Sequence, residues 1–247
     1  MIYSKQNDFL FIKGGKVAGT SVEMALSTVC GPEDIITPIT PADELERLRL
    51  GGRGAQNYSH EPEGERAYLE NLLSMGPTKE ARRVRPRSVY RNHMSLREFV
   101  ECYGSLPSER IFCVERSPYA KIISGGNMSL NIRGYKYGGG KMESNLDALR
   151  QAVATEFERM RWQPNIDGYR NADGKLNIRV LRFEALTDDF AQLMRDYGIS
   201  PAPTLPHAKQ GMNSNGIDPR EVFTRTQLDK INEIFAEEFD TFGYQKL

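Results

Sequence analysis

The sequence predicts an α/β fold in which a central, mostly parallel sheet lies between layers of helices. Three stretches carry this prediction, because each joins a short apolar run to a segment with helical periodicity: residues 9–29, 110–126 and 176–198. Short continuous apolar runs are typical of strands in buried parallel sheets. Apolar residues at spacings of three and four mark the face of a helix that packs on such a sheet. Repeated strand-to-helix units therefore favour three layers.

Composition restricts the kinds of partner. The 247 residues include 33 Lys and Arg and 33 Asp and Glu, so net charge gives no reason to expect nucleic-acid or membrane-surface binding. No stretch reaches about 18 consecutive apolar residues, so no membrane span is expected, and no secretory leader is expected either. The cysteines are Cys30, Cys102 and Cys113, which form no C-x-x-C pair. We therefore expect reduced thiols and a cytoplasmic protein.

The first strand-to-helix unit contains a glycine-rich turn. An apolar run, 9–12, precedes Gly14 and Gly15, and a helix with periodic apolar residues follows up to residue 29. Thr20 and Glu23 have the spacing of a capping box at the start of that helix. A glycine loop before a helix N-terminus binds anions, because free backbone N–H groups and the helix dipole point at the same place.

The position of the lysine in this loop decides which anion is expected. Gly14 and Gly19 have the G-x-x-x-x-G spacing of a P-loop, but Thr20 and Ser21 stand where a P-loop has Lys and Ser or Thr. The lysine is Lys16, inside the loop. The sequence thus predicts a P-loop-like phosphate cradle without the usual lysine for the β- and γ-phosphates of ATP. Its members are Gly14, Gly15, Lys16, Val17, Ala18, Gly19, Thr20 and Ser21.

A single domain is expected over 1–247, with 31–87 as an insertion rich in Gly, Pro and charge. Within the insertion, helices are predicted near 43–50 and over 65–75. The basic run 82–87 is either a solvated loop or a contact for an acidic acceptor or for a nucleotide.

A second strand is predicted over 88–91, directly before His93. Ser95 and Glu98 then have the spacing of another capping box. A lone histidine is usually structural. At the carboxyl end of a parallel strand, however, His93 would lie where such folds bind ligands, as would Lys16.

The third strand, 110–115, leads into a helix expected to end near 125–126. Arg116 follows the strand, and Ser124 lies two turns along the helix face that begins at Ser117. A guanidinium donates two parallel hydrogen bonds to a phosphate. Arg116 and Ser124 are therefore predicted to converge on one anion.

The rest of the chain supplies further elements of the α/β pattern. Residues 127–145 are expected to be a glycine-rich mobile loop over the site. A helix over 146–162, a strand over 176–183 with a helix up to Gly198, and a final core helix over 226–239 are also predicted.

These motifs, in this order, resemble those of the sulfotransferase superfamily, which uses 3′-phosphoadenosine 5′-phosphosulfate (PAPS), and most closely its bacterial and carbohydrate-type members. The resemblance covers most of the chain. Its last segment, 239–244, resembles the C-terminal end of the bacterial and carbohydrate-type members, and five earlier sites carry the rest. They are Lys16–Ser21 for the 5′-phosphosulfate loop, Asn92–Ser95 for the catalytic-histidine segment, Arg116 and Ser124 for the 3′-phosphate motif, Phe183 for the aromatic ring at adenine, and Lys209 for a late phosphate loop.

The resemblance implies a sulfuryl transfer from PAPS to an acceptor hydroxyl, leaving adenosine 3′,5′-bisphosphate (PAP). It implies that His93 is the base and that Lys16 stabilises the leaving phosphate oxygen. No metal is implied. The acceptor is a glycan or a small metabolite, and residues 31–87 are expected on the acceptor side. Two alternatives stay open: a P-loop kinase or NTPase, or a non-catalytic module of the same fold that binds a nucleotide or glycan. The oligomeric state is not predicted.

Overall fold

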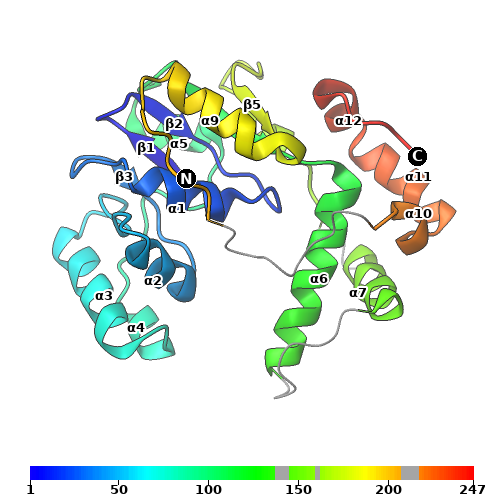
Figure 1. Cartoon of the computed structure of the whole chain (residues 1–247), viewed down its shortest axis with the longest axis horizontal. Helices are drawn as coiled ribbons and strands as arrows, with labels where there is room; N and C mark the ends of the chain where they lie inside the picture. The colour runs from blue at the N-terminus through cyan, green and yellow to red at the C-terminus, as the bar shows by residue number, and fades with distance from the viewer. Residues whose placement is uncertain (137–144, 159–161, 207–216) are drawn as a thin grey trace. The chain divides into compact units, whose positions relative to one another are not determined.

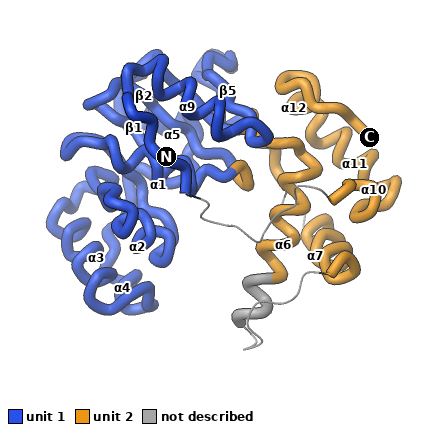
Figure 2. Tube along the Cα trace, in the orientation of Figure 1, with its two compact units in different colours: residues 1–14, 18–114, 167–208 blue, residues 15–17, 115–166, 209–247 orange. Residues whose placement is uncertain are grey.

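The computed structural model describes residues 1–136, 145–158, 162–206 and 217–247 (Figure 1). The chain forms two compact units, each assembled from separate stretches of sequence (Figure 2). Unit 1 comprises residues 1–14, 18–114 and 167–208, and unit 2 comprises 15–17, 115–166 and 209–247. The expectation of one domain with an insertion at 31–87 stays a prediction.

One mixed five-stranded sheet confirms the α/β class. Its strand order is β3 (Ile35–Ile36), β1 (Ile2–Ser4), β2 (Phe9–Phe11), β4 (Ile111–Glu115) and β5 (Arg179–Arg182). β2 and β4 are parallel, with Leu10 opposite Ile111, whereas β1 is antiparallel to both β2 and β3. The expectation of a mostly parallel sheet is therefore wrong for the N-terminal half of the sheet.

The antiparallel half follows from a short turn that the sequence did not reveal. β1 has three residues, and only residues 5–8 join it to β2, which is too short for a parallel crossover. Asp34 holds the turn in place. Its carboxylate accepts hydrogen bonds from Ser4 Oγ at 2.7 Å, Lys5 N at 2.8 Å and Gln6 N at 3.1 Å.

The helices of unit 1 lie mostly at the predicted places. They are α1 (Gly19–Ser27), α2 (Pro41–Arg49), α3 (Pro62–Met75), α4 (Lys79–Arg83), α5 (Leu96–Tyr103) and α9 (Leu186–Asp196), with the 3₁₀ turn η1 (Phe183–Ala185). The capping box of α5 is confirmed: Glu98 N donates to Ser95 Oγ at 3.2 Å, and Ser95 N donates to Glu98 Oε2 at 2.7 Å. α4 was not expected within the basic run.

The predicted strand at 88–91 is wrong. Val89 N and Tyr90 N both donate to the one carbonyl oxygen of Tyr58, at 2.8 Å and 3.0 Å. In a β-strand, successive N–H groups point to opposite sides, so two of them cannot share one acceptor. Residues 89 and 90 therefore form a turn and no β-ladder. His93 therefore follows a loop, directly before α5.

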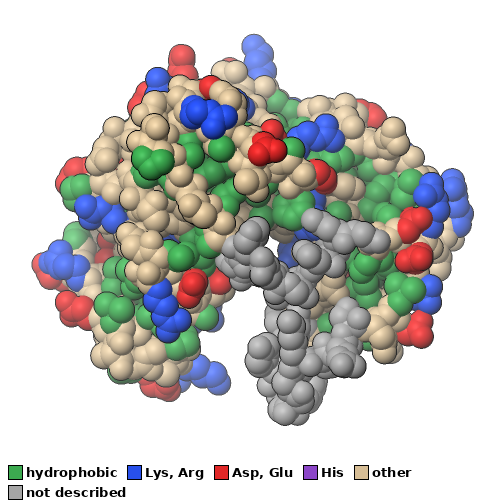
Figure 3. Space-filling view, in the orientation of Figure 1, with side chains coloured by type: hydrophobic (Ala, Val, Ile, Leu, Met, Phe, Trp, Pro, Cys, Tyr) green, Lys and Arg blue, Asp and Glu red, His purple; other side chains and the backbone are tan. Residues whose placement is uncertain are grey.

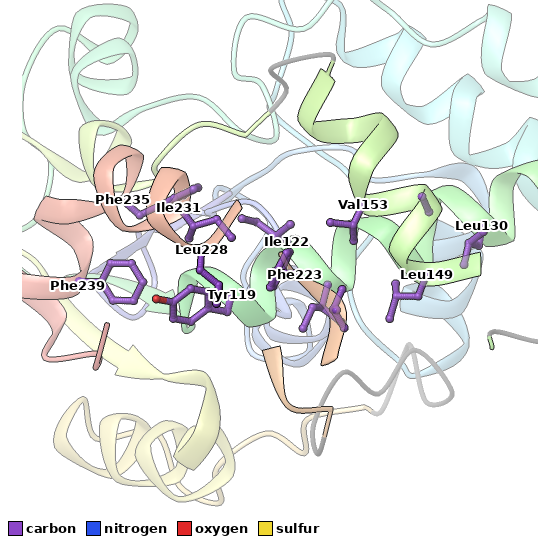
Figure 4. Packing of buried hydrophobic residues seen from close by; sticks show 13 residues of the cluster. Tyr119, Ile122, Leu130, Leu149, Val153, Phe223, Leu228, Ile231, Phe235 and Phe239 are labelled. Atoms are coloured by element: carbon purple, nitrogen blue, oxygen red, sulfur yellow. The ribbon is translucent and has the colours of Figure 1, made fainter. Parts of the chain in front are cut away.

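In the described residues of unit 2, the regular secondary structure is helical apart from Glu115, the last residue of β4. α6 (Pro118–Lys136) and α7 (Leu146–Glu158) pack with α10 (Pro219–Val222), α11 (Arg225–Ile234) and α12 (Ala236–Phe242) around the apolar cluster in Figure 4. Tyr119 and Phe239 lie at one end of this cluster and Leu130 and Leu149 at the other. The predicted final core helix is thus confirmed as packing, but it is divided into α11 and α12.

α6 does not end at its glycine pair. A Cβ at Gly125 would lie 2.0 Å from the Trp162 ring, and one at Gly126 would lie 2.8 Å from Val153 Cγ2. The two glycines therefore let neighbouring segments approach α6. Residues 127–136 continue α6 as helix, which corrects the loop expected there, and 137–144 lie outside the described residues.

In the part of the chain that the structure describes, no helix combines the length and the apolar content that crossing a membrane requires. On the face drawn in Figure 3, basic and acidic side chains are interspersed.

Candidate functional site

The loop between β2 and α1 has an unusual backbone. Lys16 and Ala18 both adopt left-handed conformations, with φ of 64° and 63°. This region costs a non-glycine residue about 1–2 kcal/mol, and such strain is concentrated at functional sites. Ala18 is the N-cap of α1, and no side chain caps the helix. The capping box predicted for Thr20 and Glu23 is therefore wrong.

The backbone N–H groups of this loop divide into used and unused donors. Ser21 N and Val22 N donate to the carbonyl oxygen of Ala18, at 3.0 Å and 3.3 Å. Gly15 N donates to Asn165 Oδ1 at 2.8 Å. Among the described residues, nothing accepts from the N–H groups of 17–20. The donors expected to hold an anion thus lie over 17–20, at the N-terminus of α1.

Glu23 is turned inward to a buried ion pair. Lys13 Nζ lies 2.5 Å from Glu23 Oε2 and 3.1 Å from Thr20 Oγ1, and Glu23 is 0% exposed. Burial alone would raise the pKa of Glu23, but the cations of Lys13, the N-terminal amine and Arg47 outweigh burial and lower it. Because the ammonium uses a lone pair of Thr20 Oγ1, the hydroxyl proton of Thr20 is directed elsewhere and is available to an anion.

The same ion pair connects to the predicted base. Asn92 Nδ2 donates to Glu23 Oε1 at 3.0 Å, and His93 Nδ1 lies 3.2 Å from the carbonyl oxygen of Lys13. A carbonyl only accepts, so Nδ1 carries the proton and Nε2 keeps a lone pair. His93 is exposed at the surface while its Nδ1 edge faces Lys13. Partial desolvation of the ring first, and the Lys13 cation second, lower the pKa of His93 to about 4.

In unit 2, Asn165 holds the peptide of Gly15 on both sides. Its Oδ1 accepts from Gly15 N at 2.8 Å, and its Nδ2 lies 3.2 Å from the Gly15 carbonyl oxygen. The same Nδ2 lies 3.2 Å from Glu115 Oε2. One amide side chain therefore fixes the start of the predicted phosphate loop to the end of β4.

Asn165 is in turn fixed by buried charges. Lys121 Nζ lies 2.7 Å from Glu115 Oε1 and is also paired with Glu238 Oε2, and all three side chains are at most 5% exposed. Glu238 Oε1 accepts the backbone N–H groups of Asn165 and Ile166. Burial first, opposed by Lys121 and assisted by the Glu238 carboxylate, raises the pKa of Glu115.

The predicted 3′-phosphate residues also lie in unit 2. Arg116 is 5% exposed directly after β4, and Ser124 is 8% exposed on α6. Lys16 Nζ lies 3.4 Å from Met128 Sδ, one helical turn beyond Ser124. Residues four apart share a helix face, so Lys16 and Ser124 lie along the same side of α6.

Two predicted ligand residues remain. Phe183 is half-buried as the first residue of η1, directly after β5, as expected for an aromatic ring at a strand end. Lys209 lies outside the described residues. The described residues contain no group of His, Cys, Asp and Glu side chains suited to a metal ion.

Sequence reasoning missed three supporting side chains: Lys13, Asn92 and Asn165. Lys13 ends an apolar strand, where a lysine side chain is normally directed to water. Its partner Glu23 lies ten residues later, and Asn165 lies 150 residues from Gly15. No local spacing rule connects such pairs. Three comparisons of the chain, with family models, with curated proteins and with solved structures, find no match.

Proposed function

We propose that the chain is a PAPS-dependent sulfotransferase with a P-loop-like, three-layer fold. It would transfer the sulfuryl group to a hydroxyl of a glycan or small metabolite. The observation that carries this proposal is the loop between β2 and α1. Its lysine precedes the Gly-Thr-Ser helix start, two of its non-glycine residues are left-handed, and its N–H groups over 17–20 have no acceptor among the described residues.

The donor's two phosphate groups would be held by different residues. The N–H groups over 17–20, with the hydroxyls of Thr20 and Ser21, suit the 5′-phosphosulfate. Arg116 and Ser124 suit the 3′-phosphate, which ATP lacks. Both side chains are nearly buried, so an anion bound there would be shielded from salt.

His93 would remove the proton from the acceptor hydroxyl through Nε2 as the acceptor oxygen attacks sulfur. The new sulfur–oxygen bond forms while the bond from sulfur to the bridging phosphate oxygen breaks. Lys16 would stabilise the charge that develops on that oxygen. The Lys13 carbonyl holds the histidine tautomer that this role requires.

The low pKa of His93 agrees with a base that is unprotonated at neutral pH. A pKa of about 4 makes it a weak base in the free protein. An anionic donor favours the imidazolium, so donor binding is expected to raise the pKa of His93 and strengthen the base.

The test is PAP release from PAPS in the presence of a panel of oligosaccharides and small alcohols. His93→Ala should lose about 100-fold or more in rate and keep its affinity for PAP. His60→Ala is the matched control and should keep the rate. Equal loss of rate and PAP affinity in His93→Ala would contradict the base assignment, and no PAP release with any acceptor would count against the activity.

A further inference from the structure

The segment between β3 and α5 encloses polar side chains that the proposed reaction does not use. Arg47 of α2, Tyr58, and Tyr68 of α3 are each 0% exposed. Arg47 Nη1 donates to Glu44 Oε1 at 3.0 Å and to the Thr37 carbonyl oxygen at 3.4 Å. Among the described residues, no atom pairs with Arg47 Nε, Arg47 Nη2 or either tyrosine hydroxyl.

A carboxylate on α3 brings the two tyrosines together. Glu65 accepts hydrogen bonds from Asn57 N at 2.6 Å and from Ser59 N at 2.7 Å, the two residues that flank Tyr58. Tyr68 follows Glu65 by three residues on α3 and so lies on the same face of the helix. Tyr58 is therefore held next to the helix that carries Tyr68.

A carboxylate on α2 brings the arginine to the same place. Glu44 Oε1 accepts the Ala55 N–H at 2.8 Å, which places the chain before Tyr58 on α2. Arg47 follows Glu44 by three residues. The charges that act on the Tyr68 hydroxyl accordingly include Arg47 and Glu44.

The two hydroxyls remain donors at every ordinary pH. Burial, and second the Glu65 carboxylate, raise the pKa of Tyr58. Burial, and second the Glu44 carboxylate, raise the pKa of Tyr68. A phenol with a raised pKa keeps its proton, so the cluster offers hydrogen-bond donors in excess.

Cationic side chains act on the hydroxyls of the cluster. The guanidinium of Arg85 acts on both tyrosine hydroxyls, and those of Arg82 and Arg47 act on the Tyr68 hydroxyl. The carboxylates of Glu44 and Glu65 oppose them, and both are already engaged by hydrogen bonds. The guanidinium groups therefore favour an anionic ligand at these donors.

We propose that Arg47, Tyr58 and Tyr68 together bind one small oxyanion, sulfate or phosphate, at a site separate from the donor loop. Native proteins leave few buried polar groups without a partner. The excess here is of donors, which oxyanion oxygens satisfy, and the guanidinium offers two adjacent N–H groups to one ion. Complete burial of all three side chains favours a free ion over an acidic group on a larger ligand.

The test is thermal unfolding of the whole chain with sulfate or phosphate, each compared with chloride at equal ionic strength. Each tenfold rise in ligand above its Kd should raise the Tm by about 3–6 °C. Tyr68→Phe and Tyr58→Phe should lose this response and keep the anion-free Tm, because their hydroxyls have no partner there. Anion binding at the donor loop would raise the Tm of every variant equally, because the loop is unchanged in all of them. A difference in anion response between variants therefore reports binding at the Arg47, Tyr58 and Tyr68 cluster.

Tyr169→Phe is the matched control. Tyr169 is 1% exposed and its hydroxyl donates to the Val114 carbonyl oxygen at 3.2 Å, so this variant should lose stability at every salt concentration and keep the anion response. An equal anion response in all variants would overturn the proposal. So would a Tm loss in Tyr68→Phe that is the same with and without the anion, because that result indicates an ordered water. An equal response to an aryl sulfate would overturn the enclosed-ion assignment.

Discussion

The two units anchor the predicted phosphate loop by different means. In unit 1, one buried lysine, Lys13, is paired with one carboxylate, Glu23, and also contacts Thr20 at the start of α1. In unit 2, one buried lysine, Lys121, lies between two carboxylates, and the neutral amide of Asn165 makes the contact to the loop. The carboxylate of Glu23 also pairs with the N-terminal amine, so unit 1 places one carboxylate between two cations, whereas unit 2 places one cation between two carboxylates.

The largest effect is expected from removing the Glu23 carboxylate, which two buried cations of unit 1 share. Glu23→Gln leaves the Lys13 ammonium buried without a carboxylate, which should lower the free energy of unfolding by about 3–5 kcal/mol. Urea unfolding measures this loss. A change as small as that of an exposed pair would show that Lys13 has another acceptor.

A smaller effect is expected in unit 2. Asn165→Ala removes the hydrogen bonds to the Gly15 peptide, so the free energy of unfolding should fall by about 1–2 kcal/mol. PAP binding should weaken about tenfold, which corresponds to about 1.4 kcal/mol. Asn71→Ala is the matched control, because Asn71 Nδ2 donates only within α3, to the Ala67 carbonyl oxygen at 2.8 Å. If both variants bind PAP equally well, Asn165 does not position the loop.

The pH dependence of stability should separate His93 from the buried carboxylate. The pKa of His93 falls from 6.5 to about 4 in the folded protein, so the unfolded chain binds more protons between these values. His93 therefore contributes stability above pH 6.5 that is lost as the pH falls toward 4. Glu23 also has a lowered pKa, so its contribution is lost only at lower pH, below its ordinary value of 4.5.

The measurement is the free energy of unfolding of wild-type and His93→Gln protein between pH 4 and pH 8. The wild type should lose stability relative to the variant below pH 6.5, with no difference in slope above it. Parallel curves through the whole range would show that the His93 pKa is not lowered.

The smallest effect on stability is expected from an exposed ion pair outside the buried ion pairs of Glu23 and Lys121. Asp147 and Arg150 of α7 form an exposed pair at 2.9 Å, with 89% and 48% of their side chains exposed. Asp147→Asn should change the free energy of unfolding by at most about 0.5 kcal/mol. A loss comparable with that of Glu23→Gln would mean that burial does not explain the difference between these pairs.

The features that could be predicted from the sequence are those whose interacting residues lie close together along the chain. The segment from β2 to α1, the capping box of α5 and the junction of β4 with α6 have signals within about ten residues, and all three are present in the structure. β1 was missed because its three residues carry no pattern. α6 passes its glycine pair because Trp162 packs there, which no local rule contains.

The candidate site likewise contains features with local sequence signals and features that depend on distant residues. The turn between β2 and α1, in which Lys16 and Ala18 are left-handed, could be predicted from the glycines, whereas phosphate binding by this turn stays a proposal. The role of Glu23 could not, because a capping box and a buried ion pair place the same residue type at the same spacing. The choice between these two roles depends on Lys13, which lies in the loop after β2, and on Asn92, which lies in a loop 69 residues from Glu23.

The most direct test of the donor site is calorimetric titration of the chain with PAP, and with ATP in the absence and presence of magnesium. We expect selective, metal-independent binding of PAP that Thr20→Val and Arg116→Ala both weaken, while Lys175→Ala, at an exposed residue, binds PAP as the wild type does. No binding of PAP, or a preference for magnesium-bound ATP, would contradict the account.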